Sequence, residues 1–428
     1  MVNSAIKKLF FITLFFIFGS SFSFKASSIL VPMDESQTNH LKAYGVSYWA
    51  LENGVIIEWL LNYKGGSFLY PHLKTIEEEL IIRGIKYQIL ADGQVNNIRS
   101  QIGNPEINME ITQLEKAPKI AVYTPSGKQP WDDAVTLVLE YAEIPYEKIY
   151  DSAIVIGMLP KYDWLHLHHE DFTGQYGKFY AAFRNYPWYK EQVAMAESNA
   201  QKLGFAKVSE MKLAVAQNIK NFVIGGGFLF TMCSGTDSYD IALAAHNTDI
   251  CESIFDGDPS HSNAQQNLDF SNGFAFENYT LERNPMVYEY SSIDGTQLRR
   301  QRRVNEEMDN FTLFDFSAKW DIVPTMLTQC HTNTIKGFMG QTTDFIKSTI
   351  KTNVLVMGEN ALLNTARYIH GELGQGTWTF YGGHDPEDYE HRVGDPPTDL
   401  NLHPNSPGYR LILNNILFPA AKKKKRKT

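Results

Sequence analysis

The chain has 428 residues, of which 43% are hydrophobic and 13% are aromatic. This length and composition exclude a disordered protein and allow a buried core larger than one ordinary domain needs, which favours a two-lobed architecture. The formal net charge of -9 argues against nucleic acid as a partner, because phosphate binding requires a basic face.

The first residues have the pattern of a secretory signal peptide, which we assign to residues 1–26. Lys7 and Lys8 provide the positive start, and the apolar run Leu9–Phe18 follows. Ser21–Ser23 offers a small-x-small cleavage site. Because the apolar run is short for a membrane-spanning helix, we expect an exported protein, periplasmic or secreted, without stable membrane insertion. An uncleaved N-terminal anchor is the alternative.

The sequence pattern of residues 27–116 predicts a first αβ unit. Its predicted elements are a strand at Ser28–Met33, a helix at His40–Leu51, an apolar segment at Val55–Tyr63, a helix at Thr75–Gly84 and a strand at Lys86–Leu90. Gly65 and Gly66 mark the end of the apolar segment.

The sequence pattern of residues 117–421 predicts a larger domain in which strands and helices alternate. The predicted strands are Lys119–Tyr123, Tyr162–His168, Phe228–Met232, Val354–Met357, Ala366–Glu372 and Thr377–Tyr381, with Ser152–Leu159 as a strand or loop. The predicted helices start at Asp132–Asp133, Val208, Ser238 and Pro407. Such alternation is typical of an α/β fold with a mostly parallel sheet covered by helices on both faces. Residues 247–329 have a mixed character, and we interpret them as an insertion that covers the site.

Two basic segments interrupt the acidic chain. The insertion carries an arginine cluster, Arg299, Arg300, Arg302 and Arg303, and residues 422–428 form a basic tail. We interpret the cluster as a solvated face and the tail as a solvated end. Contact of the tail with anionic lipid is the alternative.

The chain contains three cysteines, Cys233, Cys251 and Cys330. An odd number leaves at least one thiol free in an exported protein, and the sequence leaves open whether Cys251 and Cys330 form a disulfide. None of them has the CxxC spacing of a structural zinc site.

Cys233 stands where a predicted strand gives way to a predicted helix. The segment Gly225–Gly235 therefore matches a nucleophile elbow, in which a sharp turn lifts one side chain above the sheet. The helix N-terminus after the turn supplies backbone N–H groups that favour a thiolate and an oxyanion. The alternative is that Cys233 is a small buried apolar residue.

A histidine and two acids come after the last predicted strand. We expect Cys233 to attack an acyl carbon, His384 to transfer protons, and Glu387 or Asp385 to orient the imidazole. We expect substrate to contact the residues around these groups, namely Gly226, Gly227, Ser234, Gly235 and Gly383.

This order of motifs resembles class I glutamine amidotransferases. Their elbow reads Gly-x-Cys-x-Gly, and the chain has Thr231-Met232-Cys233-Ser234-Gly235, with Thr in place of the first Gly. Their His-Pro-Glu motif precedes the last helix, and the chain has His384-Asp385-Pro386-Glu387, with one residue inserted. The resemblance implies a flavodoxin-like fold and amide hydrolysis through a Cys–His pair.

The mature chain also resembles secreted bacterial proteins labelled asparagine synthetase B. Three segments carry this resemblance: Val31–Gly45, the HLHHEDFTGQ stretch from His166, and Gly383–Glu387. The label implies glutamine hydrolysis. No cysteine precedes Cys233 and no P-loop motif is present, so we expect hydrolysis without ATP-dependent synthesis.

The HLHHEDFTGQ stretch is also a candidate metal site. On a strand, His166 and His168 project from one face, with His169 and Glu170 at the strand end. Imidazole and carboxylate together suit a divalent metal such as zinc. The alternative is that these polar side chains only shape the crevice at the carboxyl ends of the strands.

The sequence thus supports three functional hypotheses. The first is an exported amidotransferase-like enzyme that hydrolyses an amide or acyl bond through Cys233 and His384. The second is a noncatalytic protein that binds a carbohydrate or another small polar ligand, which abundant Tyr and Trp would suit. The third is a metal-dependent hydrolase that uses the His166 cluster.

Overall fold

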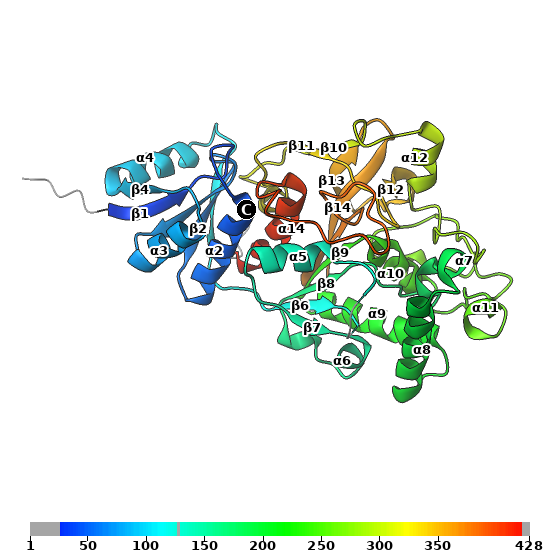
Figure 1. The fold of residues 1–428 in the computed structure, drawn as a ribbon. Coiled ribbons are helices and arrows are strands. Elements are labelled where there is room, and N and C mark those ends of the chain that lie inside the picture. Colours follow the sequence, from blue (N-terminus) through cyan, green and yellow to red (C-terminus); the bar gives the residue numbers. More distant parts are fainter. Residues whose placement is uncertain (1–25, 126–128, 422–428) are drawn as a thin grey trace, which may run out of the picture.

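The computed structural model describes residues 26–125 and 129–421, and these form two β-sheets flanked by helices (Figure 1). The signal segment, apart from its last residue, and the basic tail at 422–428 lie outside the described residues. Within the described ranges, no helix has both the length and the apolar character needed to cross a membrane.

The first sheet draws its strands from residues 26–114 and is antiparallel throughout, in the order β4-β1-β3-β2-β5. Its strands are β1 (Ala26–Val31), β2 (Ile57–Leu61), β3 (Ser67–Pro71), β4 (Gln88–Ala91) and β5 (Glu110–Leu114), and its helices are α2 (His40–Glu52), α3 (Lys74–Ile82) and α4 (Asp92–Gly103). The Asn39 side chain accepts a hydrogen bond from the Lys42 amide and so caps α2. The two predicted helices of this unit are confirmed.

The second sheet has the order β11-β10-β13-β14-β15-β9-β8-β6-β7, with β12 paired to β14. Its strands are β6 (Ile120–Tyr123), β7 (Glu147–Ile149), β8 (Trp164–Leu167), β9 (Phe228–Met232), β10 (Asn310–Leu313), β11 (Thr334–Lys336), β12 (Phe345–Ile346), β13 (Leu355–Asn360), β14 (Thr365–Leu373) and β15 (Gly376–Tyr381). The five neighbouring strands β7, β6, β8, β9 and β15 run parallel to one another. All other neighbouring pairs of this sheet run antiparallel.

The sheets are therefore antiparallel and mixed, and the prediction of a mostly parallel, flavodoxin-like sheet is wrong. The alternation of strands and helices on which that prediction depended continues only as far as β9 and the helix after it. Beyond that point the chain returns through short connections. Two residues, Gly374 and Gln375, join β14 to β15, and so short a connection can pair strands only antiparallel.

Helices cover both faces of the parallel half of this sheet. The helices of this part of the chain are α5 (Ala134–Tyr141), α6 (Asp151–Val155), α7 (Tyr180–Phe183), α8 (Pro187–Lys202), α9 (Val208–Ile224), α10 (Ser234–Ala244), α11 (Ser253–Asp256), α12 (Thr296–Arg302), α13 (Ile322–Leu327) and α14 (Pro407–Leu417). Alternate strand residues face opposite sides: Trp164 and Phe230 join the core with α5, α14 and the first sheet, whereas Leu165 and Leu229 join the core with α6, α9 and α10. In Figure 1, α14 lies between the two sheets.

Three expectations about the middle of the chain are changed by the structure. Residues 247–329 are not only a cover, because β10 from this segment is an integral strand between β11 and β13. The segment Ser152–Leu159, predicted as strand or loop, contains most of helix α6. All three cysteines are free, so no Cys251–Cys330 disulfide is formed.

Candidate functional site

A cavity of about 390 Å³ opens above the carboxyl ends of the parallel strands β8, β9 and β15. Cys233 lies directly after β9, and His169 and His384 follow β8 and β15. All three line the cavity, as do Gln341 and His391. Because parallel strands end at one edge of the sheet, side chains far apart in sequence meet here, as they do in open α/β sheets.

The turn at Cys233 has the backbone geometry of a nucleophile elbow. Its φ of 51° and ψ of -139° are a conformation that a side chain disfavours. The helix after it begins at Ser234, and the amide of Gly235 donates to the carbonyl of His168 at 2.5 Å. A Cβ at Gly235 would collide with that carbonyl. Glycine at this position therefore allows the start of α10 to pack against the end of β8.

The Cys233 sulfur is held below the cavity surface. The residue is 3% exposed, and its Sγ accepts a hydrogen bond from the Gln341 amide at 3.3 Å. Burial raises the pKa of the thiol to about 11, and the backbone amides of Gln341, Ser234 and Thr342 partly offset that rise. The resting residue is thus a neutral thiol surrounded by N–H donors.

The loop at residues 340–344 covers the sulfur, and buried contacts anchor it. The Gln341 side chain donates to the carbonyls of Gly177 and Tyr288, at 2.7 and 3.1 Å. Thr342 donates to the carboxylate of Asp237 at 2.7 Å. Burial raises the pKa of Asp237 to about 7. These contacts hold the Gln341 amide against Cys233.

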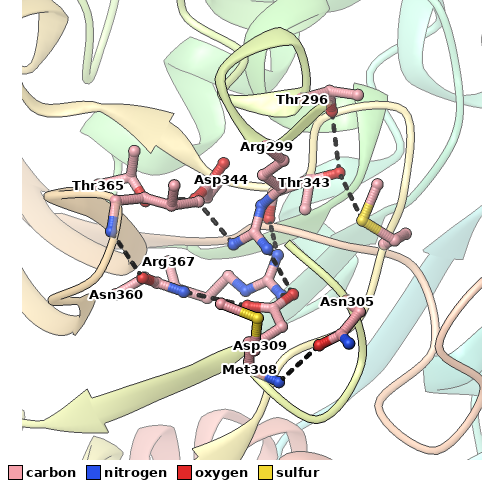
Figure 2. A network of polar contacts seen from close by, with 12 residues as sticks. Thr296, Arg299, Asn305, Met308, Asp309, Thr343, Asp344, Asn360, Thr365 and Arg367 are labelled. Atoms are coloured by element: carbon pink, nitrogen blue, oxygen red, sulfur yellow. Dashed lines mark hydrogen bonds and ion pairs between the residues drawn. The ribbon is translucent and has the colours of Figure 1, made fainter. Parts of the chain in front are cut away.

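Two buried arginines fix the far side of the same loop (Figure 2). Arg299 from α12 forms ion pairs with Asp309 and Asp344, and Arg367 from β14 contacts Asp309 at 3.3 Å. Arg299 is 1% exposed. The prediction that the arginine cluster forms a solvated face therefore fails for Arg299, because two buried carboxylates neutralise it; Arg300, Arg302 and Arg303 are exposed.

His384 follows β15 through two glycines. Gly383 has a φ of 101°, and a Cβ there would collide with the ring of Phe338. The amide of His384 donates to the carbonyl of Met339 at 2.9 Å. In the part of the chain that the structure describes, neither ring nitrogen of His384 has a hydrogen-bond partner. Burial, followed by the neighbouring His168, lowers the pKa of His384 well below its ordinary value.

The two acids expected to orient His384 have other partners. Glu387 Oε2 lies 3.1 Å from Nδ1 of His403. Asp385 accepts a hydrogen bond from the Glu387 amide at 2.9 Å. Instead of a carboxylate, the ring of His391 stacks on His384, with centroids 4.6 Å apart and planes 4° from parallel.

The histidines of the HLHHEDFTGQ stretch divide into two groups. His166 and His168 share a face, and both approach Asp133 Oδ2, His166 through Nε2 at 3.2 Å and His168 through Nδ1 at 3.4 Å. His169 lines the cavity. Glu170 accepts a hydrogen bond from the hydroxyl of Tyr150 at 3.2 Å, and within the described part of the chain it does not join any of the clusters of acids and histidines around the cavity.

The predicted substrate-binding residues lie at both ends of β9. Ser234, Gly235 and Gly383 flank Cys233 and His384. Gly226 and Gly227 precede β9 and so lie at its opposite end, about 20 Å or more from Cys233 at the usual strand rise.

Several residues at this site were not among the sequence-predicted ones. They are Asp132, Asp133, Gln341 and His391. Asp133 is the N-cap of α5, and its side chain accepts hydrogen bonds from the amides of Val135 and Thr136. The sequence pattern of a helix start predicts this role. The same pattern does not indicate that Asp133 contacts His166. Nε2 of His391 lies 2.8 Å from Asp132, and no local pattern relates these two positions.

No protein-family model matches the chain, and no curated protein is significantly similar to it. Similar solved structures include two cytoplasmic proteins from Salmonella typhimurium, STM3548 and STM1381, at 9% and 10% identity and TM-scores of 0.33 and 0.34. Each match covers 71% of this chain and 100% of the other. A GH42 β-galactosidase, Gan42B from G. stearothermophilus, matches at 11% identity and a TM-score of 0.24, over 63% of this chain and 28% of that one. TM-scores at this level do not establish a shared fold.

Proposed function

We propose that the protein is a cysteine-dependent hydrolase that cleaves an amide or related acyl bond in a small polar substrate. The observation that carries the proposal is that Cys233, in a strained strand-to-helix turn, lines one cavity with His384, whose two ring nitrogens have no hydrogen-bond partner among the described residues. Strained backbone of this kind persists where the surrounding structure enforces it, and it clusters at active sites.

The chemistry starts from the neutral thiol and neutral imidazole of the resting site. His384 accepts the thiol proton as the sulfur attacks the acyl carbon, and it then protonates the departing amine. Water hydrolyses the resulting thioester and restores the thiol. The amides of Ser234 and Gln341, which already point at the sulfur, would donate to the oxyanion. Asp133 is a nearby carboxylate that favours protonated His384.

The order of Cys233 and His384 along the chain, which resembles that of class I glutamine amidotransferases, agrees with this chemistry. An amide such as that of glutamine is therefore the first substrate to test. We also propose, from the N-terminal pattern, that the protein acts after export. N-terminal sequencing of the protein recovered outside the cytoplasm would give a chain beginning shortly after Ser23; recovery of the intact N-terminus would contradict this.

The test compares three proteins on a panel of amides and activated esters, with ammonia or alcohol release as the measurement. We expect Cys233→Ala to lower kcat/KM at least about 10³-fold, whereas Cys330→Ser, which changes a thiol outside this cavity, keeps wild-type activity. Mass spectrometry of protein treated with a chloroketone analogue of the best substrate should place the adduct on Cys233. Full activity of Cys233→Ala would refute the proposal.

A second candidate function is ligand binding without chemistry. Four aromatic side chains line the cavity, namely Trp131, Phe179, Tyr288 and Tyr389, and such rings suit sugars and other small polar ligands. This candidate predicts that Cys233→Ala binds the ligand as tightly as the wild type and that the wild type leaves the ligand unchanged.

A further inference from the structure

His168, His169 and His384 bring three imidazoles together beside the cavity, which His169 and His384 line. Their ring centroids are 4.5 Å apart for His168 and His169, 4.5 Å for His168 and His384, and 5.5 Å for His169 and His384. One nitrogen from each ring lies within 4.8 Å of the other two. Two of the rings come from the end of β8 and the third from the end of β15, so the fold and not the local sequence assembles this group.

Most nitrogens of these rings lack partners among the described residues, although His168 and His384 are buried and His169 is half-buried. His168 is 1% exposed and His384 is 8% exposed. Nδ1 of His168 pairs with Asp133 at 3.4 Å. Among the described residues, Nε2 of His168, Nδ1 of His169 and both nitrogens of His384 have no hydrogen-bond partner. A buried polar atom without a partner costs about 1–3 kcal/mol. Several such atoms that face one another indicate a ligand that satisfies them together.

We infer that His168, His169 and His384 bind one divalent transition-metal ion of the Zn²⁺ class. Imidazole nitrogens are preferred ligands of such ions, and three histidines with an open fourth position form a common zinc coordination set. Zn–N bonds of about 2.0–2.1 Å place tetrahedral ligand nitrogens about 3.3 Å apart. The three nitrogens now lie within 4.8 Å of one another, so metal binding requires the rings to move closer together.

Asp133 completes the arrangement around His168. Its carboxylate lies 3.4 Å from Nδ1 of His168, which leaves Nε2 for the metal. A carboxylate on the second nitrogen of a ligating histidine fixes the ring orientation and strengthens the bond to the metal. The open position of the metal faces the cavity, because His169 and His384 both line it.

This ligand set differs from the one expected from the sequence. Both nitrogens of His166 already have partners, the Phe230 carbonyl and Asp133, each at 3.2 Å. Glu170 contacts Tyr150. Asp132 forms a second group with His384 and His391, but it is already paired with His391. Among the described residues, the group of His168, His169 and His384 has no hydrogen bond or ion pair between its own members.

The metal has a consequence that rests on the proposed function. The lone pair of His384 cannot both bind a cation and accept the proton of Cys233. Occupied metal sites would therefore lack the base for thiol chemistry, and Zn²⁺ would inhibit the hydrolase by competing with that proton transfer.

The binding test uses isothermal titration of Zn²⁺ into chelator-treated protein, together with the absorption bands of bound Co²⁺. We expect one equivalent to bind and the Co²⁺ spectrum to be that of a tetrahedral site. His168→Ala should abolish this binding, and Asp133→Asn, which keeps all three ligands, should weaken it about 10–100-fold. His72→Ala, on the first-sheet side of the molecule, is the matched control and should bind as the wild type does. The inference would be overturned if His168→Ala and His384→Ala both bound Zn²⁺ as tightly as the wild type does.

Activity separates this inference from the proposed function. Inhibition of the wild type by stoichiometric Zn²⁺, with loss of that inhibition in His168→Ala, supports both. Binding of Zn²⁺ together with activity that requires it keeps the metal site and overturns the role of His384 as a base. Cys233-dependent activity without metal binding overturns the metal site alone.

Discussion

The backbone amide of Gln341 donates a hydrogen bond to the sulfur of Cys233 at 3.3 Å, across 108 residues of sequence. The donor belongs to the loop at residues 340–344, which Asp237 holds on one side and Arg299 on the other through Asp344. The nucleophile of the proposed hydrolase is therefore covered by a loop whose position depends on buried charges elsewhere.

The pH dependence of alkylation should report the buried state of Cys233. With the thiol pKa raised to about 11, only about 10⁻⁴ of the residue is thiolate at pH 7, and the thiolate is the reactive form. We expect the iodoacetamide rate at Cys233, followed by peptide mass spectrometry, to rise about tenfold per pH unit between pH 7 and 10. A rate that is already maximal near pH 7 would mean that a histidine has taken the proton.

Removal of Arg299 should destabilise the protein strongly. Arg299→Ala leaves the buried carboxylates of Asp309 and Asp344 without their shared partner. Breaking a buried ion pair in this way costs about 3–5 kcal/mol. Urea unfolding measures the difference, and Arg302→Ala on the same helix, which changes an exposed side chain, should cost no more than about 0.5 kcal/mol. Equal effects of the two substitutions would argue against the network in Figure 2.

Two glycine substitutions should have opposite effects on stability. Gly235→Ala places a methyl group against the His168 carbonyl and the Thr231 hydroxyl, so we expect a loss of about 1–3 kcal/mol and displacement of His168. Gly93→Ala, in α4, meets no atom within 4 Å and should stabilise by about 0.4–1 kcal/mol. Denaturant midpoints measure both, and a neutral Gly235→Ala would contradict the close packing of α10 on β8.

A pair of stacked histidines should make the protein sensitive to acid. The rings of His40 and His331 stack with centroids 4.3 Å apart. Burial and then the charge of Arg410 lower the pKa of His40 to about 3 and that of His331 to about 4. Because the folded pKa values lie below the unfolded value of 6.5, their contribution to stability is complete above pH 6.5 and is lost as the pH falls toward 4.

Each of these histidines then contributes a slope of up to about 1.4 kcal/mol per pH unit in that window. We expect His331→Gln to lower the slope of unfolding free energy against pH between pH 6 and 4 by up to about 1.4 kcal/mol per pH unit. The difference between variant and wild type should stay constant above pH 7. An unchanged acid slope in the variant would show that these rings are not the groups that titrate.

Local sequence signals identified many elements well. The apolar run before Cys233 gives β9 at Phe228–Met232 with the predicted bounds, and α14 (Pro407–Leu417) begins at the predicted residue, Pro407. Helix α4 has no predicted counterpart, because its buried residues are only Val95, Ile98 and Ile102 in a polar segment. The strands β14 and β15 were predicted, but their antiparallel pairing makes the second sheet mixed and not mostly parallel.

The sequence by itself determined that Cys233 stands at a bend between a strand and a helix, since short-range apolar patterning and glycine spacing specify such a turn. Only the tertiary structure decided which partners surround it. The imidazoles of His168, His169 and His384 meet, and Glu387 turns to His403, because strand order in a sheet brings together residues with no local relationship. Sheet order is set by the burial of whole faces, which no segment encodes alone.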